Sequence, residues 1–188
     1  GFIWAMLRDD RPWGGSDPPG VVFTYAPGRA GIHAETMLKG FEGVLQVDGY
    51  TGYNRLADGR RAEGGRLQLA FCWAHARRKL IDARPAGSSF VDEALNRIAE
   101  LYVLEKEVRG QSPEIRLAAR QERSVPLLTA MHAWLLQQAA RLPAKSNLGT
   151  AAAYVLEHWS GLILFAADGR IEMDSNLIEN RIRPLTLG

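Results

Sequence analysis

Short apolar runs and turn-rich segments alternate over the first half of the chain. Phe2 to Leu7 and Val21 to Tyr25 are apolar and aromatic, which is typical of β-strands. The segment between them, residues 9–20, is dense in Pro and Gly, so a hairpin with a long loop is predicted. Two further strands are predicted at Gly43 to Val47 and Leu67 to Trp73, the first of them buried on both faces like a central strand.

Apolar residues at helical spacing lie between and after these strands. They predict helices over Gly31 to Phe41, Gly49 to Asp58 and His75 to Ala83. The order strand, strand, helix, strand, helix, strand, helix favours a mixed α/β sheet. No stretch of the sequence approaches the ~18–20 apolar residues that a membrane-spanning helix needs, so no membrane partner is expected.

The second half of the chain has a different pattern. Residues 90–110 and 113–141 combine heptad-like apolar spacing with many Glu, Arg and Gln residues, which predicts a helical hairpin, either an insertion or a separate helical layer. A further helix is predicted over Lys145 to Ala167, and Asp174 or Ser175 is predicted to cap a last helix. We therefore divide the chain into the N-terminal part of the core (residues 1–84), the helical insertion (85–150) and the C-terminal helices that complete the core (151–188).

Composition bounds the class of protein. Hydrophobic residues make up 46% and charged residues 23% of the 188 residues, the balance of an ordinary globular domain. The net charge of +2 does not by itself indicate nucleic acid, but Asp48 to Arg84 contains eight basic and four acidic residues. Such a local excess would attract a polyanion, unless it is only a solvated helix face. The single cysteine, Cys72, excludes an internal disulfide and fits a reducing cytoplasm.

Two carboxylates far apart in the sequence are candidates for chemistry. Asp48 follows a predicted strand and precedes Gly49, which allows close approach of backbone or ligand. Glu179 lies about one turn inside the last predicted helix. Carboxylates supplied by a strand end and a late helix are what a two-metal phosphoryl-transfer site requires. The alternatives are an Asp that starts a turn and a Glu that favours a helix N-terminus.

The stretch CWAHARRK, from Cys72 to Lys79, lies between the two carboxylates. Cys72 and His75 have C-x-x-H spacing, but zinc needs three or four ligands and no other cysteine is present, so a structural zinc site is not favoured. His75 is predicted to orient a carboxylate or to contact a phosphate; alternatively it caps a helix or lies at the core rim.

Three basic residues follow His75 within one turn. If the preceding strand lies beside Asp48, they border the carboxylates and can contact phosphates; otherwise they form a solvated helix face. The three are Arg77, Arg78 and Lys79. Asp9 and Asp10, at the end of the first strand, are either a third carboxylate or loop residues, and we favour the loop.

Several of these segments together resemble the DDE-type transposases of bacterial insertion sequences, specifically the insertion sequence 66 family. The resemblance runs in order through LQVDGYTGYNRL, CWAHARRKL, the helical stretch and EMDSNLIENRIRPLTLG. CWAHARRK and the D-x-N-x-x-E-x-x-x-R-P ending are its specific parts. The resemblance implies an α/β, RNase H-like mixed sheet with an α-helical insertion. It also implies that the first strand, which carries the first acid of a catalytic triad, is missing from this chain.

The same resemblance assigns roles to individual residues. It implies that Asp48 and Glu179 are the second and third acids and the ligands of Mg²⁺, with Mn²⁺ as an alternative. It implies DNA contacts from the basic stretch and the last helix, at His75, Arg77, Arg78, Lys79 and Arg183. The implied partners are the DNA ends of an insertion sequence and its target, further copies of the protein and accessory proteins of the same element. The implied location is the bacterial cytoplasm, at the nucleoid.

The function predicted from the sequence is therefore that of a transposase fragment for Mg²⁺-dependent DNA cleavage and strand transfer, inactive alone because the first acid is absent. The alternative is a non-catalytic DNA-binding or regulatory remnant. A nuclease with the same core and a gene fragment without selected function are further alternatives.

Overall fold

The computed structural model describes residues 1–57 and 67–186, and the side chains among them up to residue 182. The fold is mixed α/β, as predicted, but the strands form two separate pairs instead of one sheet. β1 (Phe2–Arg8) pairs antiparallel with β2 (Gly20–Ala26), and β3 (Gly43–Val47) pairs parallel with β4 (Leu67–Phe71). The predicted hairpin is thus confirmed, while the single mixed sheet is wrong for the described residues.

A small apolar core holds the two strand pairs together. Helix α1 (Gly31–Met37), the 3-10 turn η2 (Thr51–Tyr53) and helix α2 (Asn54–Ala57) contribute to it, and Trp4 of β1 packs against it. The β1–β2 hairpin therefore contacts the β3–β4 pair by side-chain packing and not by hydrogen bonds between strands. As a result Val44 to Gln46 of β3 are only half-buried, and the expectation of a strand buried on both faces is wrong.

Two boundaries differ from the prediction for local reasons. Helix α1 ends at Met37 and not at Phe41, because the chain turns through Gly40 at a φ of 75°. Strand β4 ends at Phe71, since Cys72 is already the N-cap of α3 (Trp73–Asp82).

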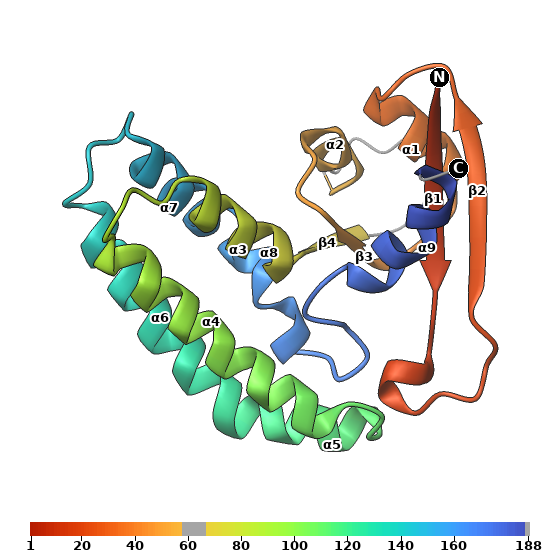
Figure 1. Cartoon of the computed structure of the whole chain (residues 1–188). Helices are drawn as coiled ribbons and strands as arrows, with labels where there is room; N and C mark the ends of the chain where they lie inside the picture. Colours follow the sequence, from red (N-terminus) through yellow and green to blue (C-terminus); the bar gives the residue numbers. More distant parts are fainter. Residues whose placement is uncertain (58–66, 187–188) are drawn as a thin grey trace.

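The helical hairpin is confirmed and forms the second half of the molecule (Figure 1). Helix α4 (Ser89–Val108) is followed by α5 (Pro113–Ala119), the π-helical turn η3 (Arg120–Ser124) and α6 (Val125–Ala139). The side chains of Ser88 and Ser112 cap α4 and α5 by accepting backbone N–H groups. These helices share one apolar core with α3 and α7 (Asn147–Glu157), centred on residues such as Trp73 and Leu135 that are fully buried.

The single helix predicted over Lys145 to Ala167 is wrong, because the chain breaks at His158. Helix α7 ends there, and α8 (Trp159–Leu162) and the 3-10 turn η4 (Leu164–Ala166) follow in new directions. The break brings Gly161 against β4, where an added Cβ would lie 2.6 Å from the carbonyl oxygen of Leu69.

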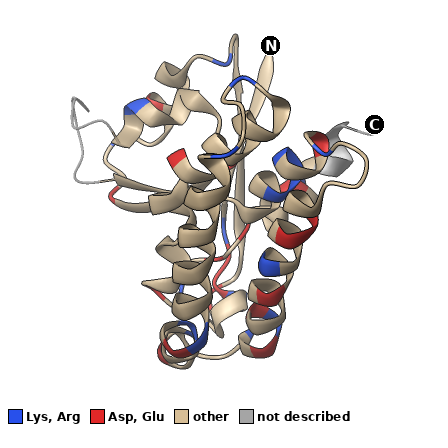
Figure 2. Ribbon diagram, turned by 90° about the vertical axis from the view of Figure 1, so that its left-hand side faces the viewer, with Lys and Arg blue, Asp and Glu red and all other residues tan. Residues whose placement is uncertain are grey.

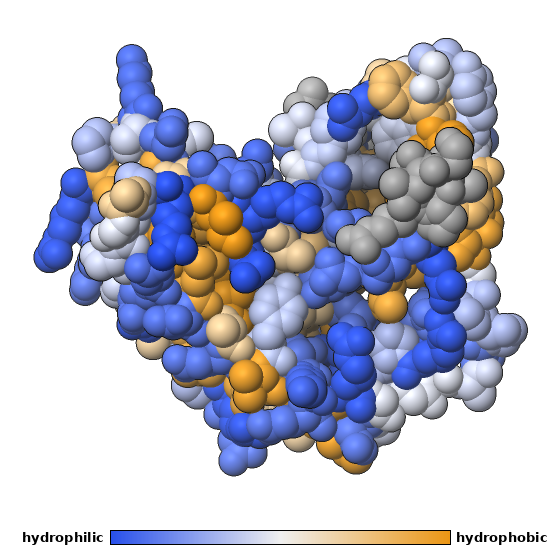
Figure 3. All heavy atoms as spheres, in the orientation of Figure 1, coloured by the Kyte–Doolittle hydropathy of each residue, from blue (hydrophilic) through white to orange (hydrophobic). Residues whose placement is uncertain are grey.

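The last helix, α9 (Asn176–Thr186), packs against β1, and the 3-10 turn η1 (Arg11–Trp13) lies in the hairpin loop. Figure 3 shows the surface hollowed between the helical part and the half that holds α1, α2 and the hairpin. Apolar side chains remain exposed on the hairpin, namely Phe2, Ile3, Val22, Phe23 and Tyr25. Within the described residues, no helix is long and apolar enough to cross a bilayer.

Candidate functional site

The candidate site lies at the carboxyl edge of β3 and β4. Because these strands are parallel and Val47 is opposite Phe71, Asp48 and Cys72 leave the two strands side by side. Ligands of α/β proteins bind characteristically outside the carboxyl ends of parallel strands. The strand that precedes the basic stretch of α3 therefore lies beside Asp48, which the predicted phosphate contacts of this stretch require.

Asp48 is exposed and held in a turn by its neighbours. Its Oδ1 accepts a hydrogen bond from the Tyr50 backbone N–H at 2.9 Å, and its carbonyl oxygen accepts one from the Tyr154 hydroxyl at 3.4 Å. Burial, together with the negative charge of Asp48, raises the pKa of Tyr53 to about 12 and also raises the pKa of Tyr154. The charge of the Asp48 carboxylate therefore acts on both tyrosine side chains.

Gly49 fixes the direction of this turn and supports a first prediction. Its φ is 89°, and an added Cβ would lie 2.2 Å from the Tyr154 hydroxyl oxygen. We expect Gly49→Ala to lower the free energy of unfolding by about 2–3 kcal/mol, through backbone strain and the displaced tyrosine. Gly87→Ala is the matched control, because Gly87 also has a positive φ but an added Cβ there meets nothing within 4 Å. Urea unfolding of both variants measures the difference, and equal losses would remove the role given to Tyr154.

The segment before α9 returns to the same edge through hydrogen bonds. The Gln46 side-chain amide of β3 donates to the Glu172 carbonyl oxygen at 2.6 Å. The backbone N–H of Trp73, at the start of α3, donates to the Met173 carbonyl oxygen at 3.1 Å. One contact from each of two elements therefore fixes where the last helix begins.

Asp174 and Ser175 share the cap of α9. The carboxylate of Asp174 accepts the Asn176 N–H at 3.0 Å, whereas the Ser175 carbonyl oxygen accepts the N–H groups of Ile178 and Glu179. The Ser175 hydroxyl donates to Oε1 of Glu179 at 3.2 Å. Glu179 is thereby directed back toward the strand edge.

Cys72, His75 and Glu179 come together at this edge. Their ligand atoms lie within 4.8 Å of one another, and His75 Nδ1 is 3.6 Å from Glu179 Oε1. Cys72 is buried, while His75 and Glu179 are half-buried. The neighbouring Cys72 raises the pKa of His75, with smaller contributions from the charges of Glu179 and Asp48. Burial acts to raise the pKa of the Cys72 thiol, but His75 and Ser175 together outweigh it and lower that pKa.

The structure thus brings His75 beside Glu179, and the charge of Asp48 acts on the same imidazole. Asp48 does not belong to the close group of three, which is the one cluster of metal-binding side chains among the described residues. Asp9 and Asp10 are engaged elsewhere: Asp9 pairs with Arg11, which lowers its pKa, and Asp10 pairs with Arg8.

The basic residues of α3 are exposed and divide between two directions. Arg77 and Arg78 line a hollow of about 510 Å³ that Tyr102 and Asn176 also border. Lys79 points the other way, with Nζ 5.7 Å from the centre of the Tyr154 ring. Figure 2 shows that charges of both signs are interspersed along the helices, so the overall distribution does not separate a basic face. The side chain of Arg183 lies outside the described residues, and its predicted DNA contact is untested.

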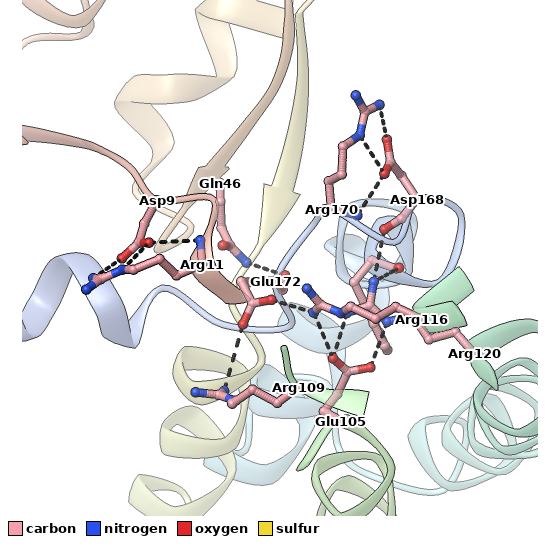
Figure 4. A network of polar contacts seen from close by, with 11 residues as sticks. Asp9, Arg11, Gln46, Glu105, Arg109, Arg116, Arg120, Asp168, Arg170 and Glu172 are labelled. Carbon is pink, nitrogen blue, oxygen red and sulfur yellow. Dashed lines mark hydrogen bonds and ion pairs between the residues drawn. The ribbon is translucent and has the colours of Figure 1, made fainter. Parts of the chain in front are cut away.

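A buried ion network, which the sequence did not predict, connects the helical hairpin to this site (Figure 4). Glu105 of α4 accepts two hydrogen bonds from Arg120 of η3, at 2.8 and 2.6 Å. The other terminal nitrogen of Arg120 donates to the carbonyl oxygens of Phe165 and Asp168. Arg116 and Arg120, which lie in the buried part of the network, have side chains only 1% exposed.

Glu172 connects the network to the carboxyl ends of β3 and β4. Its carboxylate pairs with Arg116 and, at 3.8 Å, with Arg109, while its backbone carbonyl holds Gln46 of β3. The helical hairpin therefore positions the segment that leads into α9. Glu105 is the signal that could have revealed this, because it falls among the apolar heptad positions of α4, where a carboxylate needs a buried partner.

The fold and this edge define a class: an α/β protein with carboxylate, imidazole and thiol groups gathered at the carboxyl ends of parallel strands. Comparison with known families makes this specific. The family described as "Transposase IS66 family" matches residues 1–188, and the chain belongs to it. No solved structure matches the chain.

Curated relatives come from Sinorhizobium fredii (strain NBRC 101917 / NGR234). The chain is similar to "Uncharacterized protein y4jD", with 44% identity over 98% of this chain and 37% of the relative. It is also similar to "Uncharacterized protein y4qI", with 40% identity over 99% of this chain and 35% of the relative. The chain thus spans little more than a third of the length of these relatives.

Proposed function

We propose that the chain is part of the catalytic core of a DNA transposase, in which Asp48 and Glu179 hold Mg²⁺ for DNA cleavage and strand transfer. The single observation that carries the proposal is the convergence of the Asp48 turn and Glu179 of α9 at the carboxyl edge of β3 and β4. Family membership supports it. The residues fit the ion, because Mg²⁺ prefers carboxylate oxygens together with water and phosphate.

Each residue of the edge has a role in this proposal. Bound Mg²⁺ would supply activation of a water or DNA 3′-hydroxyl and neutralise charge on the phosphate. The carboxylates of Asp48 and Glu179 hold the ion, with Mn²⁺ as an alternative. Ser175 and His75 orient Glu179 from two sides, at 3.2 and 3.6 Å. Lys79, Arg77, Arg78 and Arg183 are proposed to bind DNA phosphates.

An RNase H-like sheet interrupted by the helical insertion, residues 85–150, is the proposed framework. The two strand pairs are compatible with it, because β1 and β3 each have one edge without a strand partner among the described residues. The network through Arg120 and Glu172 gives the insertion a role in placing α9.

The proposed partners are the DNA ends of an insertion sequence and target DNA, with further copies of the protein and accessory proteins of the same element. The proposed location is the bacterial nucleoid. The second candidate, a non-catalytic DNA-binding or regulatory protein, is favoured by one observation: the basic residues of α3 are exposed outside the close group of three. DNA binding that persists in Asp48→Asn without Mg²⁺, while strand transfer by the wild type is absent, would favour this candidate.

The phosphate contacts can be tested by their salt dependence. We expect the combined replacement of Arg77, Arg78 and Lys79 by Ala to weaken DNA binding. The plot of log K against log salt should also become less steep, by up to about 3 in slope, because each lost phosphate contact removes about 0.9. The matched control replaces three exposed basic residues elsewhere, Lys106, Arg141 and Lys145. Fluorescence anisotropy at several salt concentrations measures both slopes. A slope that falls equally in the control would mean that α3 is not the DNA contact.

A further inference from the structure

The geometry points to a second kind of metal site at the same edge: we propose that Cys72 Sγ, His75 Nδ1 and the Glu179 carboxylate bind Zn²⁺, with water in the fourth position. Three protein ligands with a water or substrate in the fourth position are the usual arrangement of catalytic zinc sites, whereas structural zinc sites have four protein ligands. Thiolate and imidazole are soft or borderline ligands that favour Zn²⁺ over Mg²⁺. The donor set therefore selects a different metal from the one proposed for Asp48 and Glu179.

The distances are close to those that the metal needs. Zinc bond lengths of about 2.0–2.3 Å place tetrahedral ligand atoms about 3.3–3.8 Å apart. His75 Nδ1 and Glu179 Oε1 are already 3.6 Å apart, and all three ligand atoms lie within 4.8 Å of one another. His75 Nδ1 is also shielded from solvent and makes no hydrogen bond with the described residues. A small side-chain adjustment would bring the group to zinc-binding geometry.

Ser175 donates hydrogen bonds to two of the three proposed ligands. Its backbone N–H donates to Cys72 Sγ at 3.2 Å, and its hydroxyl donates to Glu179 Oε1 at 3.2 Å. Hydrogen bonds of this kind orient metal ligands and commonly change affinity ten- to a hundred-fold. Cys72 also lies at the N-cap of α3, where the helix dipole favours a thiolate.

Co²⁺ is the probe for this site, because it replaces Zn²⁺ and absorbs light. We expect the protein to bind one Co²⁺ with tetrahedral d–d bands and a thiolate-to-cobalt charge-transfer band, which Zn²⁺ then displaces. Cys72 is the single cysteine of the chain, so a thiolate band at one equivalent of metal already identifies it, even if a Cys72 variant fails to fold. Weak octahedral bands without charge transfer would overturn the proposal.

Variants identify the remaining ligands. We expect Cys72→Ser to lose the charge-transfer band, and His75→Ala and Glu179→Gln each to weaken Co²⁺ binding at least ten-fold. His33→Ala is the matched control, since His33 lies on α1 outside the group, and its affinity should be unchanged. Equal affinity in His75→Ala and His33→Ala would assign the metal to other ligands.

A consequence follows that also rests on the proposed function: Zn²⁺ bound through Glu179 would compete with Mg²⁺ and inhibit strand transfer. Cys72→Ser should raise the Zn²⁺ concentration that half-inhibits strand transfer at least ten-fold, measured relative to the variant's own rate with Mg²⁺ alone. If Co²⁺ binds as expected but Zn²⁺ does not inhibit, the zinc site stands and the role of Glu179 in catalysis falls. If the cobalt spectra show no tetrahedral thiolate site while Glu179→Gln is inactive, the catalytic role of Glu179 stands and the zinc site falls.

Discussion

Replacing Glu179 by Gln is expected to lower the proposed Mg²⁺-dependent DNA strand transfer about a thousand-fold or more. The proposed reason is the loss of one anionic metal ligand, worth several kcal/mol in the transition state, and a factor of a thousand corresponds to about 4 kcal/mol. Gln keeps the shape of Glu and can still accept the hydrogen bond from the Ser175 hydroxyl, so α9 should remain in place. Asp48→Asn should behave alike, because its Oδ1 can still accept the Tyr50 N–H.

The matched control is Glu157→Gln, which removes a carboxylate from α7 outside the close group of three. Excision and insertion of a marked element in cells, scored for each variant beside wild type, measure the effect. DNA binding by Glu179→Gln should be retained, which separates lost chemistry from lost folding. Activity within a few-fold of wild type for both Glu179→Gln and Asp48→Asn would remove these residues from the proposed mechanism.

The strand edge of this site was predictable from the sequence, because local pattern determines it. Gly43 to Val47 is a short apolar run ended by Asp48-Gly49, and the structure has a strand with those bounds. The run from Leu67 likewise forms β4, and its parallel pairing brings the basic stretch of α3 beside Asp48. Each strand depends on residues within a few positions of one another, whereas their pairing joins segments more than twenty positions apart and was only a condition in the sequence analysis.

The close group of three was not predictable, because it depends on contacts across about a hundred residues. C-x-x-H spacing alone offered two ligands, and the third, Glu179, reaches them only because Ser175 contacts both Cys72 and Glu179. The separation of the strands into two pairs has a similar cause. The sequence shows that Trp4 is apolar but does not show that it packs against the β3–β4 core while β1 pairs only with β2 among the described residues.

Arg120→Met is expected to lower the free energy of unfolding by about 3–5 kcal/mol, the usual cost of breaking a buried ion pair from one side. The substitution removes both hydrogen bonds to Glu105 and leaves the carbonyl oxygens of Phe165 and Asp168 without this donor. Methionine fills a similar volume, so most of the loss comes from the uncompensated polar groups and not from a cavity. Urea unfolding followed by circular dichroism measures it.

Arg123→Met is the matched control, because Arg123 lies one turn away and its pair with Glu107 is about half exposed on both sides. We expect that variant to unfold much like wild type, since exposed pairs contribute little. Equal losses in the two variants would mean that the π-helical turn itself, and not the ion network, stabilises the helical hairpin. The double variant Arg120→Met with Glu105→Leu should recover part of the loss, because it also removes the buried carboxylate that has lost its main partner, while Arg116 keeps its pair with Glu172. Since Arg120 holds the segment that leads through Glu172 to α9, the same loss should weaken Co²⁺ binding at Glu179, whereas Arg123→Met should not.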